Sequence, residues 1–100
     1  MNRGLIGCLA IVVVSLSASA QAQNASPQLL SISCAGCHGP NGHSPGSIPS
    51  LYGRSSASLA EMMRAFRGGQ KPATVMNRIA KGYSDAEIDA MAQEIAATWK

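Results

Sequence analysis

The chain has 100 residues and a formal net charge of +3, and 46% of its residues are hydrophobic whereas only 4% are aromatic. This length fits one small domain, and such a domain buries so little apolar surface that it commonly needs a disulfide, a metal or a bound group for stability. The modest charge has no concentrated basic stripe, which excludes a nucleic-acid-binding module.

The beginning of the chain has the pattern of an export signal. Arg3 precedes the apolar stretch 5–16, which is followed by the small residues of "SASAQA". This order predicts a secretory signal peptide over residues 1–20, cleaved after Ala20 or Ala22. The apolar stretch is shorter than the roughly 20 residues that span a bilayer, so we expect no membrane span after its removal. The remaining domain, 24–100, is expected to be periplasmic.

Proline and glycine separate the rest of the chain into helices and loops. Ser26 followed by Pro27 predicts the start of a helix that runs through "QLLSISCAGC". The segment 39–53 then holds three prolines and four glycines, which predicts a loop. A loop of this length is expected to be ordered by a group that it wraps.

Helical periodicity continues after this loop. Ser58 with Glu61 is a predicted capping box, and an apolar stripe follows at Leu59, Met62, Met63 and Phe66. A short helix is predicted in "NRIAK", closed by a glycine. A second capping box, at Ser84 and Glu87, precedes a longer apolar stripe at Ile88, Met91, Ala92, Ile95 and Trp99. No alternating strand pattern occurs, so the predicted fold class is all-α with long loops.

The stretch "CAGCH" concentrates the chemistry of the chain in five residues. Cys34 and Cys37 project from one side of a helical turn, and His38 follows at once. Two thiols at this spacing can form thioethers to the two vinyl groups of a haem, while the adjacent imidazole coordinates its iron. The pattern therefore predicts one covalently bound haem c, held by Cys34 and Cys37 with His38 as a ligand of the iron.

Three other readings of these residues use only part of the pattern. Export to an oxidising compartment favours a Cys34–Cys37 disulfide. A thioredoxin-like redox pair expects a βαβ context, which the sequence lacks. A zinc site built from the two cysteines, His38 and His43 has four nominal ligands, but adjacent ligands at positions 37 and 38 do not easily reach one tetrahedral ion.

From about Ser26 to Lys100 the chain resembles the class I cytochromes c. Besides "CAGCH", the segment "PSLYG" resembles the Pro-x-Leu-x-Gly segment of that family. The resemblance implies a small fold of helices and long loops around one haem, with the N- and C-terminal helices crossing beside it. It also implies that the Pro49 carbonyl accepts a hydrogen bond from His38 Nδ1–H, which would fix the ring as a ligand.

The stretches "KPATVMNRIAKGYSDAEIDAMA" and "GHSPGSIPSLYG" resemble the cytochrome subunits of flavocytochrome c sulfide dehydrogenases more narrowly. In those proteins the methionine that matches Met76 is the distal ligand of the haem iron. Its placement agrees, because Met76 follows an irregular segment, whereas Met62, Met63 and Met91 lie on apolar stripes where methionine usually packs in a core. His43 is the rival ligand, but it lies only five residues from His38.

The predicted function is that of an exported one-electron carrier without catalytic residues of its own. The resemblance implies a haem subunit or electron acceptor of a sulfide-oxidising flavoprotein. A generic periplasmic carrier, a ligand-binding haem sensor or enzyme, and a haem-free thiol or zinc module are the alternatives. The segment 54–81 has six basic residues and one acid, which predicts a basic face that attracts an acidic partner.

Overall fold

The computed structural model describes residues 25–100, and the predicted signal peptide lies outside these residues. The described part of the chain consists of α1 (Pro27–His38), the short 3-10 helix η1 (Pro40–Gly42), α2 (Ser56–Arg67), α3 (Met76–Ala80) and α4 (Asp85–Thr98). No strand occurs between residues 25 and 100, and the predicted all-α class is confirmed. None of the helices in this range has the length and apolarity of a bilayer span.

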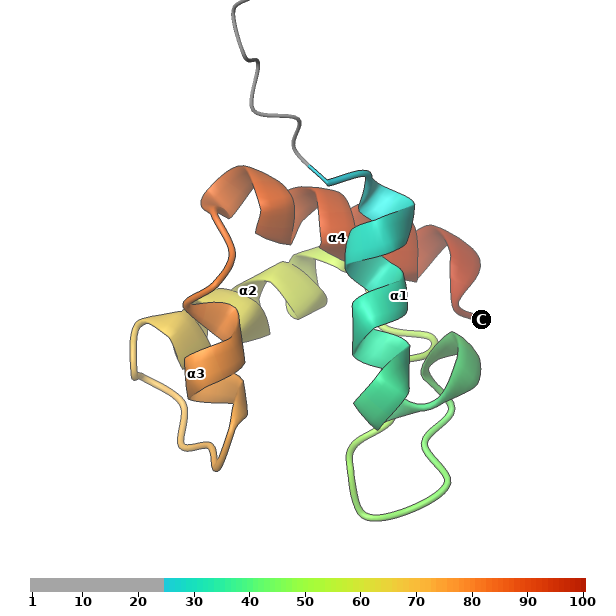
Figure 1. Ribbon diagram of the computed structural model, residues 1–100, viewed down its shortest axis with the longest axis horizontal. Helices are drawn as coiled ribbons and strands as arrows, with labels where there is room; N and C mark the ends of the chain where they lie inside the picture. The colour runs from blue at the N-terminus through green and yellow to red at the C-terminus, as the bar shows by residue number, and fades with distance from the viewer. Residues whose placement is uncertain (1–24) are drawn as a thin grey trace, which may run out of the picture.

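The helices are arranged around α4. Both α1 and α2 pack on α4, and the short α3 packs on α2. In Figure 1, α1 crosses α4, as expected for the first and last helices of the predicted fold. The C-terminal end of α1 and the N-terminal end of α3 extend to the same side of the α2–α4 pair. The two segments that carry the predicted iron ligands therefore share one side of the molecule.

The core is small and lies where the three longer helices meet. The predicted stripe of α4 is buried, and residues from α1 and α2 complete the cluster: Leu30, Leu59, Ala60, Ile88, Met91, Ala92, Ile95 and Trp99. The largest side chain that is fully buried is Ile88. A core of this size supplies limited apolar burial, in agreement with the expectation that the domain depends on a bound group.

The start and end of α1 follow from local sequence. The Ser26 hydroxyl accepts a hydrogen bond from Leu29 N at 3.2 Å, with Pro27 in the first turn. Gly39 ends the helix at φ 88°, and a Cβ at this residue would lie 1.9 Å from the His43 carbonyl oxygen. Only glycine fits this turn, which redirects the chain directly after His38.

One of the two predicted capping boxes is wrong and the other is confirmed. The α2 helix begins earlier than predicted, because the Ser55 hydroxyl accepts the hydrogen bond from Ser58 N at 3.1 Å. Ser58 is therefore inside the helix rather than its cap. At the start of α4, Ser84 and Glu87 form the reciprocal pair, with backbone-to-side-chain distances of 2.9 and 3.1 Å.

Candidate functional site

The last two turns of α1 carry two free thiols. Cys34 and Cys37 form no disulfide, and Cys34 is partly buried whereas Cys37 is exposed. Burial raises the pKa of the Cys34 thiol, although a hydrogen bond with Ser33 acts in the opposite direction. The Cys34 Sγ lies 3.6 Å from the Sδ of Met91 in the core. The Cys34 thiol therefore lies against the core, whereas the Cys37 thiol lies at its exposed edge, and neither is consumed by a disulfide.

The imidazole of His38 is held in one tautomer. Its Nδ1 lies 2.5 Å from the carbonyl oxygen of Pro49. A carbonyl oxygen can only accept a hydrogen bond, so Nδ1 donates the proton, and in the neutral ring the lone pair is then on Nε2. The contact between His38 and Pro49 that the family resemblance implies is present. It leaves Nε2 as the ring atom that can bind a metal.

The loop that supplies Pro49 is fixed at its base to the C-terminal end of α4. The Gly42 carbonyl accepts a hydrogen bond from Leu51 N at 2.9 Å, and Gly53 N donates to the Trp99 carbonyl at 3.1 Å. Gly42 has φ 73°, and a Cβ there would lie 2.7 Å from a ring carbon of Trp99. This close approach lets the loop close over Trp99, and the backbone around Pro49 is positioned as a result.

Met76 is the first residue of α3, and its side chain is half-buried. The helix is fixed by Ala80, which is fully buried, and α3 packs on α2. Beside Met76, the Oδ1 of Asn77 is buried and has no hydrogen-bond partner among residues 25–100. A buried amide oxygen without a partner is uncommon and marks a place where a further group is expected. Asn77 is not among the site residues that the sequence predicts, and its one sequence signal is that a polar residue follows the predicted ligand Met76.

His43 lies in a separate cluster. Its ring stacks on Tyr52, with centroids 3.9 Å apart and planes at 12°, and its Nε2 lies 3.4 Å from the Lys100 carbonyl oxygen. No group of three or more His, Cys, Asp or Glu side chains in the described range is placed to hold a metal ion. The four nominal zinc ligands, Cys34, Cys37, His38 and His43, are therefore not brought together.

The residues of this side of the molecule fit a haem. Two free thiols on α1, the His38 imidazole and the Met76 thioether at the start of α3 are the donors that such a group uses. Exposed apolar side chains occur in the same loop as Pro49 and around α3: Ile48, Val75 and Ile79. A large apolar group bound here would cover such surface, which solvent now contacts.

The predicted basic face is partly neutralised within the chain. Arg64 bonds to Asp85 at 3.1 Å and to Asp89 at 2.8 Å, and Arg67 bonds to Asp85 at 2.5 Å. Arg67 first and Arg64 second lower the pKa of the Asp85 carboxyl. These ion pairs join the C-terminal half of α2 to the start of α4. Two of the six basic residues in the segment 54–81, Arg64 and Arg67, therefore form ion pairs within the chain, in addition to any contact with a partner protein.

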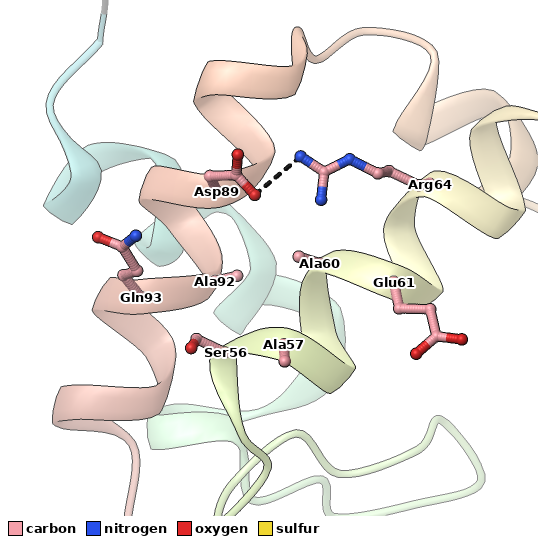
Figure 2. Close-up of a pocket in the computed structure, with 8 residues that line it drawn as sticks. All are labelled: Ser56, Ala57, Ala60, Glu61, Arg64, Asp89, Ala92 and Gln93. Carbon is pink, nitrogen blue, oxygen red and sulfur yellow. Dashed lines mark hydrogen bonds and ion pairs between the residues drawn. The ribbon is translucent and has the colours of Figure 1, made fainter.

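An open groove of about 450 Å³ lies between α2 and α4 (Figure 2). It is lined by small and polar residues, with the Arg64–Asp89 ion pair at one end: Ser56, Ala57, Ala60, Glu61, Arg64, Asp89, Ala92 and Gln93. None of the lining residues is a thiol, an imidazole or a thioether. The groove is thus separate from the donors described above and is not the candidate site.

Comparison with known proteins gives two related sequences. No protein-family model matches the chain. Over 66 residues the chain is 46% identical to the cytochrome subunit of sulfide dehydrogenase from Chlorobaculum tepidum. This alignment covers 66% of this chain and 60% of that protein. It is 39% identical, over 67 residues, to the thiosulfate dehydrogenase electron acceptor of Stutzerimonas stutzeri, covering 63% of this chain and 31% of that protein.

The chain thus spans less than two thirds of the length of either relative. Both relatives are named for a part in electron transfer, one as a cytochrome subunit and the other as an electron acceptor. With the all-α fold and the thiol–imidazole site in place, these similarities confirm the resemblance of this chain to the class I c-type cytochromes.

Proposed function

We propose that this chain binds one covalent haem c and carries single electrons in the periplasm, as a subunit or electron acceptor of a dehydrogenase that oxidises reduced sulfur. The observation that carries the proposal is the hydrogen bond of His38 Nδ1 to the Pro49 carbonyl, next to two free thiols. A disulfide would occupy those thiols, and a hydrogen bond at Nδ1 leaves the ring ready for a metal at Nε2.

Four residues would hold the group. Cys34 and Cys37 would attach it through thioethers, and His38 and Met76 would provide the two axial ligands. A haem bound in this way supplies a reversible one-electron centre, and a methionine opposite a histidine raises its reduction potential. The chain's own contribution is orientation: the Pro49 carbonyl fixes the imidazole ring and increases its basicity as a ligand.

The chain would act as a carrier rather than as the enzyme itself. If His38 and Met76 both bound the iron, no ligand position would remain for a substrate. The relatives support this division, because one is named a cytochrome subunit of a dehydrogenase and the other a dehydrogenase electron acceptor. The donor would be a partner protein, and the narrower sequence resemblance favours a flavoprotein that takes two electrons from sulfide and passes them on singly.

The first experiment tests the cofactor. The full chain is expressed in a host with a haem-attachment machinery, and the mass of the exported product is measured by mass spectrometry. We expect one haem per chain that resists acid-acetone extraction, and a product without the leader residues 1–20 or 1–22. A Cys37→Ala control should retain at most one thioether. An unmodified mass with an intact disulfide would refute the proposal.

The second experiment tests the role. The haem-loaded protein is mixed with sulfide, with thiosulfate, and with each in the presence of the dehydrogenase purified from the same source. We expect reduction of the haem only when the dehydrogenase is present. Carbon monoxide binding by the untreated reduced protein would instead favour a ligand-binding sensor or enzyme, because it requires an open axial position. If only an unrelated dehydrogenase reduced the haem, the role of a generic periplasmic electron carrier would remain.

A further inference from the structure

The turn between α3 and α4 connects three helices through the backbone of Tyr83. Its N–H donates a hydrogen bond to the carbonyl of Ala80, the last residue of α3, at 3.3 Å. Its carbonyl accepts a hydrogen bond from Nη1 of Arg67, the last residue of α2, at 3.2 Å. The next residue, Ser84, caps α4. The backbone of Tyr83 is therefore fixed against α2 and α3 at the point where α4 begins.

The side chain of Tyr83 extends to the remaining long helix, α1. Its hydroxyl oxygen lies 3.3 Å from the Oγ of Ser33, the residue before Cys34. Ser33 Oγ already donates its one proton to the Leu30 carbonyl at 2.6 Å, so the Tyr83 hydroxyl is the donor in the pair with Ser33. The Tyr83 ring is partly buried and packs against the core cluster. Ring packing and the hydroxyl contact thus direct this side chain toward the turn of α1 that carries the thiols.

This contact connects two helices that do not otherwise pack broadly on each other. Between residues 25 and 100, α1 packs on α4 and α3 packs on α2, but α1 and α3 share no extensive contact of their own. Figure 1 shows the C-terminal end of α1 and the helix α3 standing apart on one side of the α2–α4 pair. Among the described residues, the pair of Tyr83 and Ser33 is the one hydrogen bond between α1 and the segment 76–84.

The position of α3 depends on such contacts, because the helix is too short to be stable alone. It has five residues, and no side chain caps its N-terminal end at Val75. Isolated helices need about 12–15 residues to be even marginally stable in water. Fully buried Ala80 fixes the C-terminal end of α3, and the turn with Tyr83 follows directly. Met76 lies at the opposite end of the helix, so its placement is determined through α3 from that turn.

We propose that Tyr83 is a positioning residue for the two axial ligands, because it fixes the spacing between the end of α1 with His38 and the helix α3 with Met76. This inference rests on the proposed function, in which both residues bind the same iron. Two ligands on separate helices hold one metal ion only while the helices keep their distance. If the Tyr83 hydroxyl contact were lost, α3 would be held by α2 alone, and the Met76 thioether would leave the iron more often.

The size of the expected effect follows from the geometry of the contact. A distance of 3.3 Å is longer than the ordinary O–H···O range of about 2.5–3.0 Å. The contribution is therefore no more than that of one ordinary hydrogen bond, which changes an equilibrium about twofold to tenfold. The fold as a whole should persist without it, whereas the equilibrium between bound and released Met76 should change.

The test uses the haem-loaded full chain in its oxidised state and imidazole as an external ligand. Imidazole can bind the iron only when the Met76 thioether has left, so its apparent affinity measures how firmly Met76 is held. Tyr83→Phe and Ser33→Ala each remove one side of the hydroxyl contact, and a double variant combines them. Tyr52→Phe, which removes the hydroxyl of an exposed tyrosine in the loop, is the matched control.

We expect Tyr83→Phe and Ser33→Ala each to increase the apparent imidazole affinity about twofold to tenfold. The double variant should show no more than the larger single effect, because both substitutions break the same contact. Ser33→Thr, which keeps the hydroxyl, and Tyr52→Phe should behave like the wild type. Ser33 is exposed, so Ser33→Ala provides the test even if Tyr83→Phe fails to load haem.

Two results would overturn the inference. One is an unchanged imidazole affinity in Tyr83→Phe and Ser33→Ala, even with lower melting temperatures, because Tyr83 would then only pack in the core. The other is a double variant in which the two effects add, because the hydroxyls would then act separately.

The failure of this inference is distinguishable from the failure of the proposed function. Mass spectrometry that shows no haem on the wild-type chain would refute the proposed function, and the inference with it. A haem-loaded chain whose long-wavelength iron–sulfur band is lost in Met76→Ala, but whose imidazole affinity ignores Tyr83 and Ser33, would refute the inference alone.

Discussion

The Sγ of Cys34 lies 3.6 Å from the Sδ of Met91, so the first thiol of the Cys-x-x-Cys pair rests on the buried stripe of α4. Met91 is 2% exposed and belongs to the core cluster. The contact joins the cofactor-attaching turn of α1 to the packing of α1 against α4. Site and core are therefore continuous in this small domain, and the methionines of the chain are expected to differ sharply in role.

Met91→Ala is expected to destabilise the haem-loaded protein without changing its iron ligands. Removal of a buried methionine side chain typically costs about 2–5 kcal/mol, because apolar contacts are lost and a cavity remains. Chemical denaturation should show this loss, while the weak long-wavelength absorption band of an iron–methionine sulfur bond stays in place. Loss of that band in Met91→Ala would mean that the ligand assignment is wrong.

Met76→Ala should have the opposite effect. The substitution removes the proposed axial thioether from a half-buried position at the start of α3, so the core loses little. We expect the long-wavelength band to disappear, the reduction potential to fall and carbon monoxide to bind the reduced iron. Absorption spectra and a redox titration measure these changes. Met62→Ala and Met63→Ala serve as controls that should keep both the band and the potential.

Asp85→Asn should reduce stability in a pH-dependent way. Arg67 and Arg64 lower the pKa of the Asp85 carboxyl from its ordinary value of 3.8. A group whose pKa is lowered by folding stabilises the folded state above its unfolded pKa, and this contribution disappears as the pH falls through the lowered value. Melting temperatures of wild type and variant should therefore differ at neutral pH and converge below pH 3.8.

Salt and a second substitution control this pH experiment. The pair between Arg67 and Asp85 lies at the surface, so added salt should reduce the difference between wild type and Asp85→Asn. Glu61→Gln removes a carboxylate on α2 that forms no ion pair among the described residues. Its melting temperature should follow that of the wild type across the pH range. A difference of the same size in Glu61→Gln would contradict the assignment to the ion pairs.

Gly42→Ala should disrupt the loop that supplies Pro49. Gly42 has φ 73°, and a Cβ there would lie 2.7 Å from a ring carbon of Trp99 and 2.8 Å from Tyr52 N. The strain should lower the melting temperature, and displacement of the loop should weaken the contact of Pro49 with His38. Gly36→Ala is the matched control, because it lies in a helix with open space around it. That change should be neutral or stabilising, by up to about 1 kcal/mol.

Much of this protein follows from its sequence, because the signals are local. Proline after Ser26, and Ser84 with Glu87, define helix starts through backbone groups only a few residues away. The apolar stripe of α4 is buried because helical periodicity places its members on one face. The spacing within "CAGCH" indicates the cofactor chemistry for the same reason: the three donors lie within one turn and a half of helix.

Other features depend on which segments meet in space, and these only the tertiary structure decided. Ser55 rather than Ser58 caps α2, since several serines precede that helix and the fold selects one of them. The pairing of Arg64 and Arg67 with Asp85 and Asp89 arises from the packing of α2 on α4, whereas the sequence shows only a basic segment followed by an acidic one. The contact of Cys34 with Met91 and the exposure of Leu29 and Ile32 have the same origin. Residues distant in the chain come together through packing, and one-dimensional periodicity does not contain that information.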